Sequence, residues 1–246
     1  MEIETVQRYF EQSSVVEHYA RAINNVGLWA SEECLCTQYF NWDDTLLELG
    51  CGAGRIAIGL WEVGYRNLLA TDLSKAMVKE GRRINQVLEY GVAFQQADAS
   101  QLPFEDGQFD GAIFGFNGLM QIPRRENRQK AMAEVFRVLV PGSYFIFTTH
   151  DRESKRHRNY WKEERRLWQQ GRQDREIDEF GDICWDTPEG GPMYIHSPLA
   201  DEVRRDVKAA GFTIVRDVLR SSLGPERESV REFSDDCRFW VVQRPV

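Results

Sequence analysis

The sequence lacks the features of membrane-spanning and secreted proteins. No apolar run approaches the ~20 residues that a membrane helix needs. The first ten residues, MEIETVQRYF, contain no basic region followed by an apolar stretch, so we expect no signal peptide. The five cysteines are an odd number without a C-x-x-C spacing, which favours reduced thiols. These absences predict a cytoplasmic protein with no membrane association.

An excess of positive charge is missing as well. The net charge is −8, whereas nucleic-acid-binding proteins usually carry a basic patch. The excess of acidic residues therefore argues against DNA or RNA as a partner. We predict no metal site, because no H-E-x-x-H motif is present. Cys34 and Cys36 form one C-x-C without a second pair, which is more typical of two thiols on a helix than of metal ligands.

The most informative stretch of the sequence runs from Leu46 to Arg55 and reads LLELGCGAGR. An apolar run is followed by Gly50, Gly52 and Gly54, and then by apolar residues at helical spacing. A strand, a glycine turn and a helix begin a βαβ nucleotide-binding unit. The dinucleotide motif G-x-G-x-x-G does not fit, since its third glycine would fall at Arg55.

Strands and helices alternate from residue 45 to residue 150, which predicts a parallel α/β sheet. A helical segment over residues 5–40 precedes this region. The alternation stops at 151 and resumes after Pro198 with a helix, a strand, a loop-like stretch over 221–232 and a last strand. The predicted strands are 45–49, 67–71, 92–97, 109–116, 143–149, 212–219 and 237–242, and the helices between them are 54–63, 75–89, 125–139 and 199–210.

Three features at successive strand ends make residues 40–150 resemble the class I methyltransferases that use S-adenosylmethionine. The pattern E-x-G-x-G-x-G from Glu48 is similar to their motif I, acidic residues follow at Asp72 and Asp98, and Pro141-Gly142 resembles the turn before their fifth strand. The resemblance implies a Rossmann-like, doubly wound sheet of seven strands in the order 3-2-1-4-5-7-6. Strand seven would be antiparallel, with helices on both faces.

We therefore expect one methyltransferase domain over 1–246. Its parts are an N-terminal helical segment (1–40), a cofactor-binding core (41–150), an insertion (151–198), and a C-terminal helix and strand pair (199–246). The resemblance implies S-adenosylmethionine as cofactor. It also implies transfer of the sulfonium methyl to a small-molecule acceptor by in-line displacement. Alternatives are a non-catalytic module that binds S-adenosylmethionine, and a nicotinamide-dependent oxidoreductase, which the glycine spacing opposes.

The resemblance also implies cofactor contacts. Asp72 would bind the ribose hydroxyls, although it could instead cap a helix, a role that suits Ser74 better. Asp98 would contact the adenine amino group, or could simply form a turn. Tyr19 would reach the methionine end, or pack in the core. The predicted cofactor-binding residues are Glu48, Gly50, Cys51, Gly52, Gly54, Asp72, Leu73, Asp98, Ala99 and Tyr19.

Acceptor-side candidates lie at the next strand ends and in the insertion. His150 is the first candidate general base and His196 the second, each with a structural histidine as the alternative. Asn117 and Trp29 are expected to face the acceptor. No Pro-Pro-Tyr/Phe follows Asn117, which argues against a nucleic-acid base as substrate. We expect the insertion to form a lid over the acceptor, or else to pack away from it or form an oligomer contact.

Overall fold

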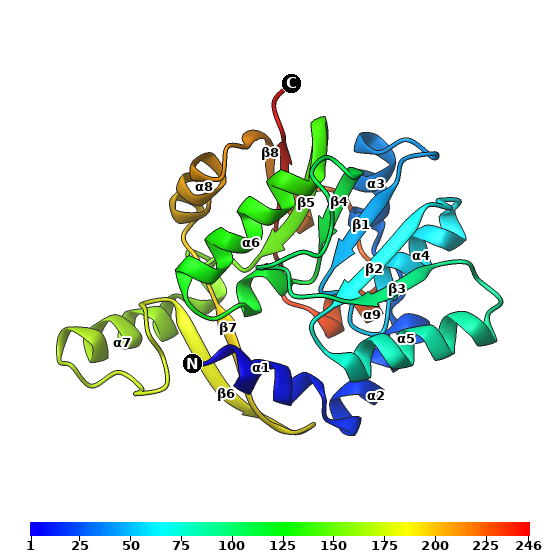
Figure 1. The fold of residues 1–246 in the computed structure, drawn as a ribbon. Coiled ribbons are helices and arrows are strands. Elements are labelled where there is room, and N and C mark those ends of the chain that lie inside the picture. The colour runs from blue at the N-terminus through cyan, green and yellow to red at the C-terminus, as the bar shows by residue number, and fades with distance from the viewer.

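A seven-stranded sheet forms the centre of the computed structural model, which describes all 246 residues (Figure 1). Its strand order is β3-β2-β1-β4-β5-β9-β8, so β8 and β9 are its sixth and seventh strands. The strands from β3 to β5 pair in parallel, and β9 is antiparallel to both neighbours. The predicted order and the reversed last strand are confirmed. The strands are β1 (Leu46–Leu49), β2 (Leu68–Asp72), β3 (Ala93–Gln96), β4 (Phe109–Phe114), β5 (Leu139–Thr149), β8 (Thr213–Leu219) and β9 (Arg238–Gln243).

Helices cover both faces of the sheet because its strands are apolar on both faces. Successive side chains of a strand point to opposite sides, and Leu46 and Leu47 accordingly enter two different hydrophobic cores. Helices α3 and α4 pack in the first core, and α6 and α8 in the second. The helices are α1 (Ile3–Phe10), α2 (Ser13–Asn25), α3 (Ala30–Tyr39), α4 (Arg55–Val63), α5 (Lys75–Val87), α6 (Arg125–Val138), α7 (Arg158–Gln169), α8 (Ala200–Ala209) and α9 (Glu228–Phe233). None of them combines the length and apolarity that crossing a membrane requires.

Two local predictions differ from the structure. The stretch 221–232, predicted to be a loop, contains most of the short helix α9. Pro141 and Gly142, predicted as a turn before strand five, lie inside β5. The pairing with β4 shifts register there, from Phe109 opposite Leu139 to Gly111 opposite Tyr144. Gly142 has a φ of +90°, so the turn residues produce a bulge, not a break.

The insertion (residues 151–198) forms a helix and a hairpin beside the N-terminus. It contains α7 and the separate two-stranded sheet of β6 (Asp182–Thr187) and β7 (Gly191–His196). Figure 1 shows the hairpin running along α1, and β7 packs against it. Gln12 Nε2 donates to the Gly190 carbonyl at 2.7 Å, and the Thr187 and Tyr9 hydroxyls lie 3.1 Å apart. The hairpin therefore supports the N-terminal helices from outside.

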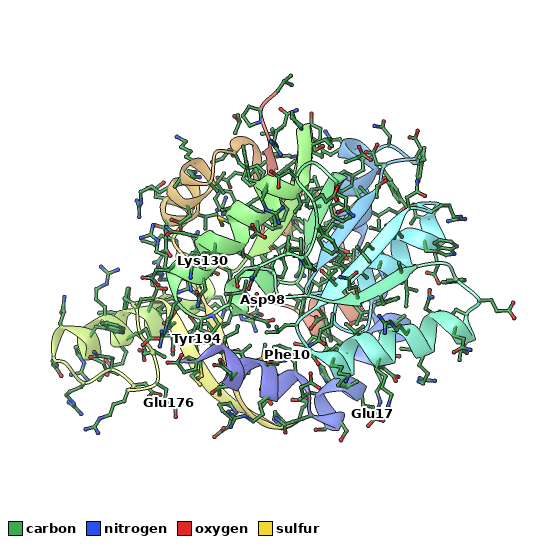
Figure 2. The ribbon with its side chains drawn as sticks, in the orientation of Figure 1. Phe10, Glu17, Asp98, Lys130, Glu176 and Tyr194 are labelled. Atoms are coloured by element: carbon green, nitrogen blue, oxygen red, sulfur yellow. The ribbon has the colours of Figure 1, made fainter.

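A buried ion network joins this hairpin to α8. His196 is completely buried, and its Nδ1 and Nε2 lie 2.7 and 2.8 Å from carboxylate oxygens of Asp182 and Glu202. Carboxylates only accept hydrogen bonds, so both ring nitrogens carry protons. The Tyr194 hydroxyl, labelled in Figure 2, also donates to Asp182 at 2.7 Å. Arg152 donates to Glu202 at 2.9 Å.

The titration of this network limits the pH range in which it stabilises the fold. Burial alone would lower the pKa of His196, but its two carboxylate partners outweigh burial and raise it above 6.5. Burial acts to raise the pKa values of Asp182 and Glu202, but hydrogen bonds to His196 give a net lowering. The stabilisation is lost as pH rises through the raised pKa of His196. It is lost again as pH falls through the lowered carboxylate pKa values.

We predict that His196→Gln lowers the stability by about 3–5 kcal/mol near pH 6, because it leaves buried carboxylates without their cation. Wild-type stability should decrease as pH rises above 6.5, and the variant should show a weaker decrease. Urea unfolding from pH 5 to 9 measures both. His157→Gln is the matched control, since His157 pairs with Asp235 at a half-exposed position. Equal effects of the two substitutions would contradict this account.

Candidate active site

The glycine turn after β1 packs Gly50 and Gly54 against aromatic rings and leaves the Cβ side of Gly52 open. Gly50, Gly52 and Gly54 have φ values of +57°, +55° and +99°, which favour glycine. A Cβ on Gly50 would lie 2.5 Å from Phe114, and one on Gly54 would lie 2.6 Å from Phe94. A Cβ on Gly52 would meet nothing nearer than Tyr19 at 3.9 Å. Only Gly52 therefore leaves its Cβ side open for a ligand.

The end of β1 also caps the helix that follows the turn. Glu48 Oε2 accepts a hydrogen bond from the backbone N–H of Ala57 at 2.9 Å. One of the free amides expected at the start of α4 is therefore already used. Burial raises the pKa of Glu48 to about 8, so this carboxyl group is largely protonated at neutral pH.

Asp72 at the end of β2 holds the glycine turn in place. Its Oδ2 accepts from the Gly52 N–H and its Oδ1 from the Ser74 N–H, each at 2.8 Å. Ser74 in turn caps α5, because its hydroxyl accepts from the Met77 N–H at 3.1 Å. An ionised carboxylate offers about four acceptor sites, so each Asp72 oxygen keeps one for a ligand hydroxyl. Burial raises the pKa of Asp72 to about 6.

These groups line a cavity with about 1080 Å³ of empty space, including its mouth. The sheet edge supplies one wall and the N-terminal helices the other. Figure 2 labels one residue of each, Asp98 beyond β3 and Phe10 on α1. The predicted residues on the cavity wall are Glu48, Gly50, Cys51, Gly52, Asp72, Leu73, Asp98, Ala99 and Tyr19.

Asp98 forms the predicted turn and lines the cavity, and its contact with the adenine amino group stays a prediction. Its Oδ1 accepts from both the N–H and the hydroxyl of Ser100, each at 2.8 Å, which is the turn-forming contact. The residue also lines the cavity. Gly54, by contrast, does not line it, because its Cα faces the Phe94 ring.

The N-terminal cover (α1 and α2, residues 3–25) forms the main wall opposite the sheet edge. Only Tyr19 was expected there, yet five further residues of the cover line the cavity: Ile3, Val6, Gln7, Phe10 and Ala22. The apolar spacing of Ile3, Val6 and Phe10 follows a helix face and could have revealed this wall. Phe233 of α9 completes it.

The insertion contributes no residue to the cavity wall, which corrects the expected lid. His196 has no free ring nitrogen, since both bind carboxylates, and it is too deeply buried to face an acceptor. Its Nδ1 and oxygens of Glu179 and Asp182 lie within 4.8 Å of one another. Arg128 pairs with Glu179, so this group forms an ion network.

Asn117 and His150 lie together behind the cavity wall. Asn117 is buried, its N–H donates to the Thr148 hydroxyl at 2.7 Å, and its Nδ2 lies 3.3 Å from His150 Nε2. Burial lowers the pKa of His150, so its ring is neutral at neutral pH. Phe116 and Asn117 have φ values of +48° and +59°. Two consecutive left-handed non-glycine residues are strained, which is typical of functional sites.

Trp29 also lies behind the wall and is completely buried. The Arg55 guanidinium lies 4.9 Å from the centre of its ring. Arg55 lines the cavity and forms a two-pronged ion pair with Glu32, with N–O distances of 2.7 and 2.6 Å. Glu32 also accepts from the Trp29 N–H at 2.9 Å. This buried pair fastens α3 to the start of α4.

Residues 47–147 match a family model described as a methyltransferase domain. This segment is therefore similar to methyltransferase domains, and the sheet around it has the class I methyltransferase fold. A curated relative, the ubiquinone/menaquinone biosynthesis C-methyltransferase UbiE of Brucella canis, is 36% identical over 106 residues. The match covers 42% of this chain and 38% of the relative, so the chain spans about two fifths of that protein's length.

Solved structures share the fold of most of this chain, including residues 47–147. A SAM-dependent methyltransferase from Methanosarcina mazei has a TM-score of 0.68 at 21% identity, covering 90% of this chain and all of that one. The 1,6-didemethyltoxoflavin-N1-methyltransferase of Burkholderia thailandensis, solved with its acceptor and S-adenosylhomocysteine, has a TM-score of 0.56 at 16% identity. That match covers 88% of this chain and 77% of the other.

The cavity fits S-adenosylmethionine chemically. The open side of Gly52 leaves room for a close approach. The spare acceptor sites of Asp72 suit a pair of ribose hydroxyls, and Asp98 offers a second carboxylate beyond β3.

We predict that Asp72→Asn weakens binding of S-adenosylhomocysteine about tenfold or more, because hydrogen bonds to a charged group contribute ~1.5–3 kcal/mol each. Ligand hydroxyls need the ionised carboxylate, so wild-type affinity should fall as pH drops through about 6. The variant should lose this dependence. Calorimetry between pH 5 and 8 measures both effects, with the exposed Asp43→Asn as control. Unchanged affinity in a folded Asp72→Asn variant would remove Asp72 from the site.

Proposed function

We propose that this protein transfers a methyl group from S-adenosylmethionine to a small-molecule acceptor. The observation that carries the proposal is one cavity that is lined both by carboxyl groups at the sheet edge and by aromatic rings. Asp72 and Asp98 belong to the first part, and Phe10, Tyr19 and Phe116 to the second. When bound, S-adenosylmethionine supplies an electrophilic methyl on a positively charged sulfur, which an acceptor atom takes up by in-line displacement.

The aromatic part of the wall suits a cation and an apolar acceptor together. The Phe10 and Tyr19 ring centres lie 5.7 Å apart, Tyr19 and Phe116 6.2 Å, and Phe116 and Phe233 5.1 Å. Aromatic faces attract a positive charge by about 0.5–2 kcal/mol. Burial raises the pKa of Tyr19, so this residue stays uncharged. The rings also exclude water and restrict the orientation of the acceptor, which accelerates a two-molecule reaction.

Two of the similar proteins support a small acceptor by their names. The Brucella canis relative is named for ubiquinone/menaquinone biosynthesis, and the Burkholderia thailandensis structure contains 1,6-didemethyltoxoflavin. The cavity lies between the sheet edge and the N-terminal cover, which suits a small molecule better than a duplex nucleic acid. We further propose a cytoplasmic location, on the basis of the odd cysteine number without paired spacing.

His150 is our proposed proton acceptor for substrates that must lose a proton. Its neutral ring has one unprotonated nitrogen. This is Nδ1 when the Asn117 amide oxygen accepts from Nε2–H across the 3.3 Å contact, the orientation in which oxygen and nitrogen of the amide are exchanged. Because His150 lies behind Phe116, it can act only on an acceptor that reaches past this ring.

We predict that S-adenosylmethionine with a labelled methyl group transfers the label to a low-mass product when the protein is incubated with pooled metabolites. His150→Gln should lower the rate by about 10²–10⁴-fold, as expected for loss of a general base, without changing the affinity for S-adenosylhomocysteine. The exposed His18→Gln is the matched control. Cofactor binding without label transfer to any pool would favour a non-catalytic binding module. An unchanged rate in His150→Gln would remove its role as base.

A further inference from the structure

Three buried side chains near the cavity contain polar atoms without a partner. Trp29 Nε1, Asn117 Oδ1 and Arg220 Nη1 make no hydrogen bond, and their residues are 0%, 2% and 5% exposed. An unpaired buried donor or acceptor costs about 1–3 kcal/mol, and native proteins contain few of them. A group of them at one place therefore indicates a ligand.

Strand pairing places Arg220 at the same edge of the sheet as His150, which contacts Asn117. Arg220 follows Leu219 of β8, which pairs with Arg238 of β9, which pairs with Thr149 before His150. Neighbouring strands are about 4.8 Å apart, so Arg220 and His150 begin about 10 Å from one another. The Arg220 guanidinium lies 4.8 Å from the centre of the Trp29 ring.

Arg220 is a buried cation whose positive charge has no closely paired carboxylate. Its Nη2 donates to the Ser234 carbonyl at 2.9 Å, and its nearest carboxylate, Asp236, is 4.0 Å from Nε. Arg55, which contacts the same Trp29 ring, is by contrast fully paired with Glu32. Removing a guanidinium from water is costly unless an anion accompanies it. The unpaired Nη1 of Arg220 therefore favours an anionic ligand over a water molecule or a neutral carbonyl.

Two stacked rings separate this group from the cavity. Phe116 and Phe233 have ring centres 5.1 Å apart at an angle of 25°, and both line the cavity. On its other side Phe116 contacts Trp29, with ring centres 5.9 Å apart. Phe116 has a strained φ of +48°, and Phe233 ends the short helix α9. These two residues form the part of the wall that a ligand has to displace.

We propose that an oxyanion subsite lies behind Phe116 and Phe233, where Trp29 Nε1 and Arg220 Nη1 donate hydrogen bonds to the carboxylate or phosphate group of the acceptor. The guanidinium supplies the charge and a forked geometry that fits such oxygens. The indole N–H supplies a second donor, and the Asn117 amide a third if its oxygen and nitrogen exchange places. This inference rests on the proposed function only in taking the anion to be part of the methyl acceptor.

The test uses benzoate and phenyl phosphate as anionic probes and benzamide as the neutral probe of similar shape. Each is titrated into the full-length protein, with and without S-adenosylhomocysteine, and followed by calorimetry. The tryptophan indole N–H signals are followed by ¹⁵N NMR, and Trp29→Phe assigns the Trp29 signal. Arg220→Met removes the charge, and the exposed Arg231→Met on α9 is the matched control.

We expect at least one anion to bind about tenfold or more tightly than benzamide, the size of one charge-assisted contact, and to shift the Trp29 indole signal. Arg220→Met should abolish this preference, and Arg231→Met should keep it. If Arg220→Met does not fold, Trp29→Phe serves instead and should weaken anion binding several-fold. The relative affinities of benzoate and phenyl phosphate identify the anion class.

The subsite would be overturned if no anion binds, or if anion and benzamide bind equally. It would also be overturned if the Trp29 signal does not shift, or if the preference for the anion survives Arg220→Met. Failure of S-adenosylhomocysteine to bind would instead overturn the proposed function, because anion selectivity is also measured in its absence.

Discussion

The hydrogen bonds that Asp72 accepts from Gly52 and Ser74 connect the elements that form the cavity. They join the turn after β1 to the start of α5 at the carboxyl edge of the sheet, where ligands bind in folds of this kind. The turn can hold this shape because Gly50 and Gly54 allow phenylalanine rings where a Cβ would clash. A carboxylate that organises the backbone and also lines the cavity couples cofactor binding to the local fold. Its raised pKa makes this coupling sensitive to pH.

The opposite wall depends on a chain of supports that begins far from the cavity. The N-terminal cover lies over the sheet edge, and the hairpin of the insertion packs along its outer side. The hairpin in turn is fastened to α8 through the buried His196 with Asp182 and Glu202. The insertion thus acts on the cavity indirectly, by positioning the helices that close it.

The sequence alone was sufficient for the sheet and for most of the residues that line the cavity at the sheet edge. Asp72 and Asp98 were predictable because each ends a strand, and the carboxyl ends of parallel strands meet at one edge. The glycine turn was predictable because its φ angles are a local property of its residues. These predictions depend on neighbours in the sequence, which a local pattern can report.

The acceptor side was not predictable, because its contacts join residues that are far apart in the sequence. His196 was expected at the cavity, but its partner Glu202 on α8 is brought to it only by the tertiary fold. Trp29 was expected to face the acceptor, but Arg220, almost two hundred residues away, decides its surroundings. The helix α9 was missed because six mostly polar residues give little periodic signal. Partners that are distant in sequence determine which polar side chains remain free.

The central claim is that the cofactor binds between the sheet edge and the N-terminal cover. Hydrogen–deuterium exchange with and without S-adenosylhomocysteine tests this most directly. The account predicts that residues 3–25 and the turn at 50–54 gain protection when the ligand binds, while α7 of the insertion stays unchanged. Protection gained in the insertion, with none in residues 3–25, would contradict it.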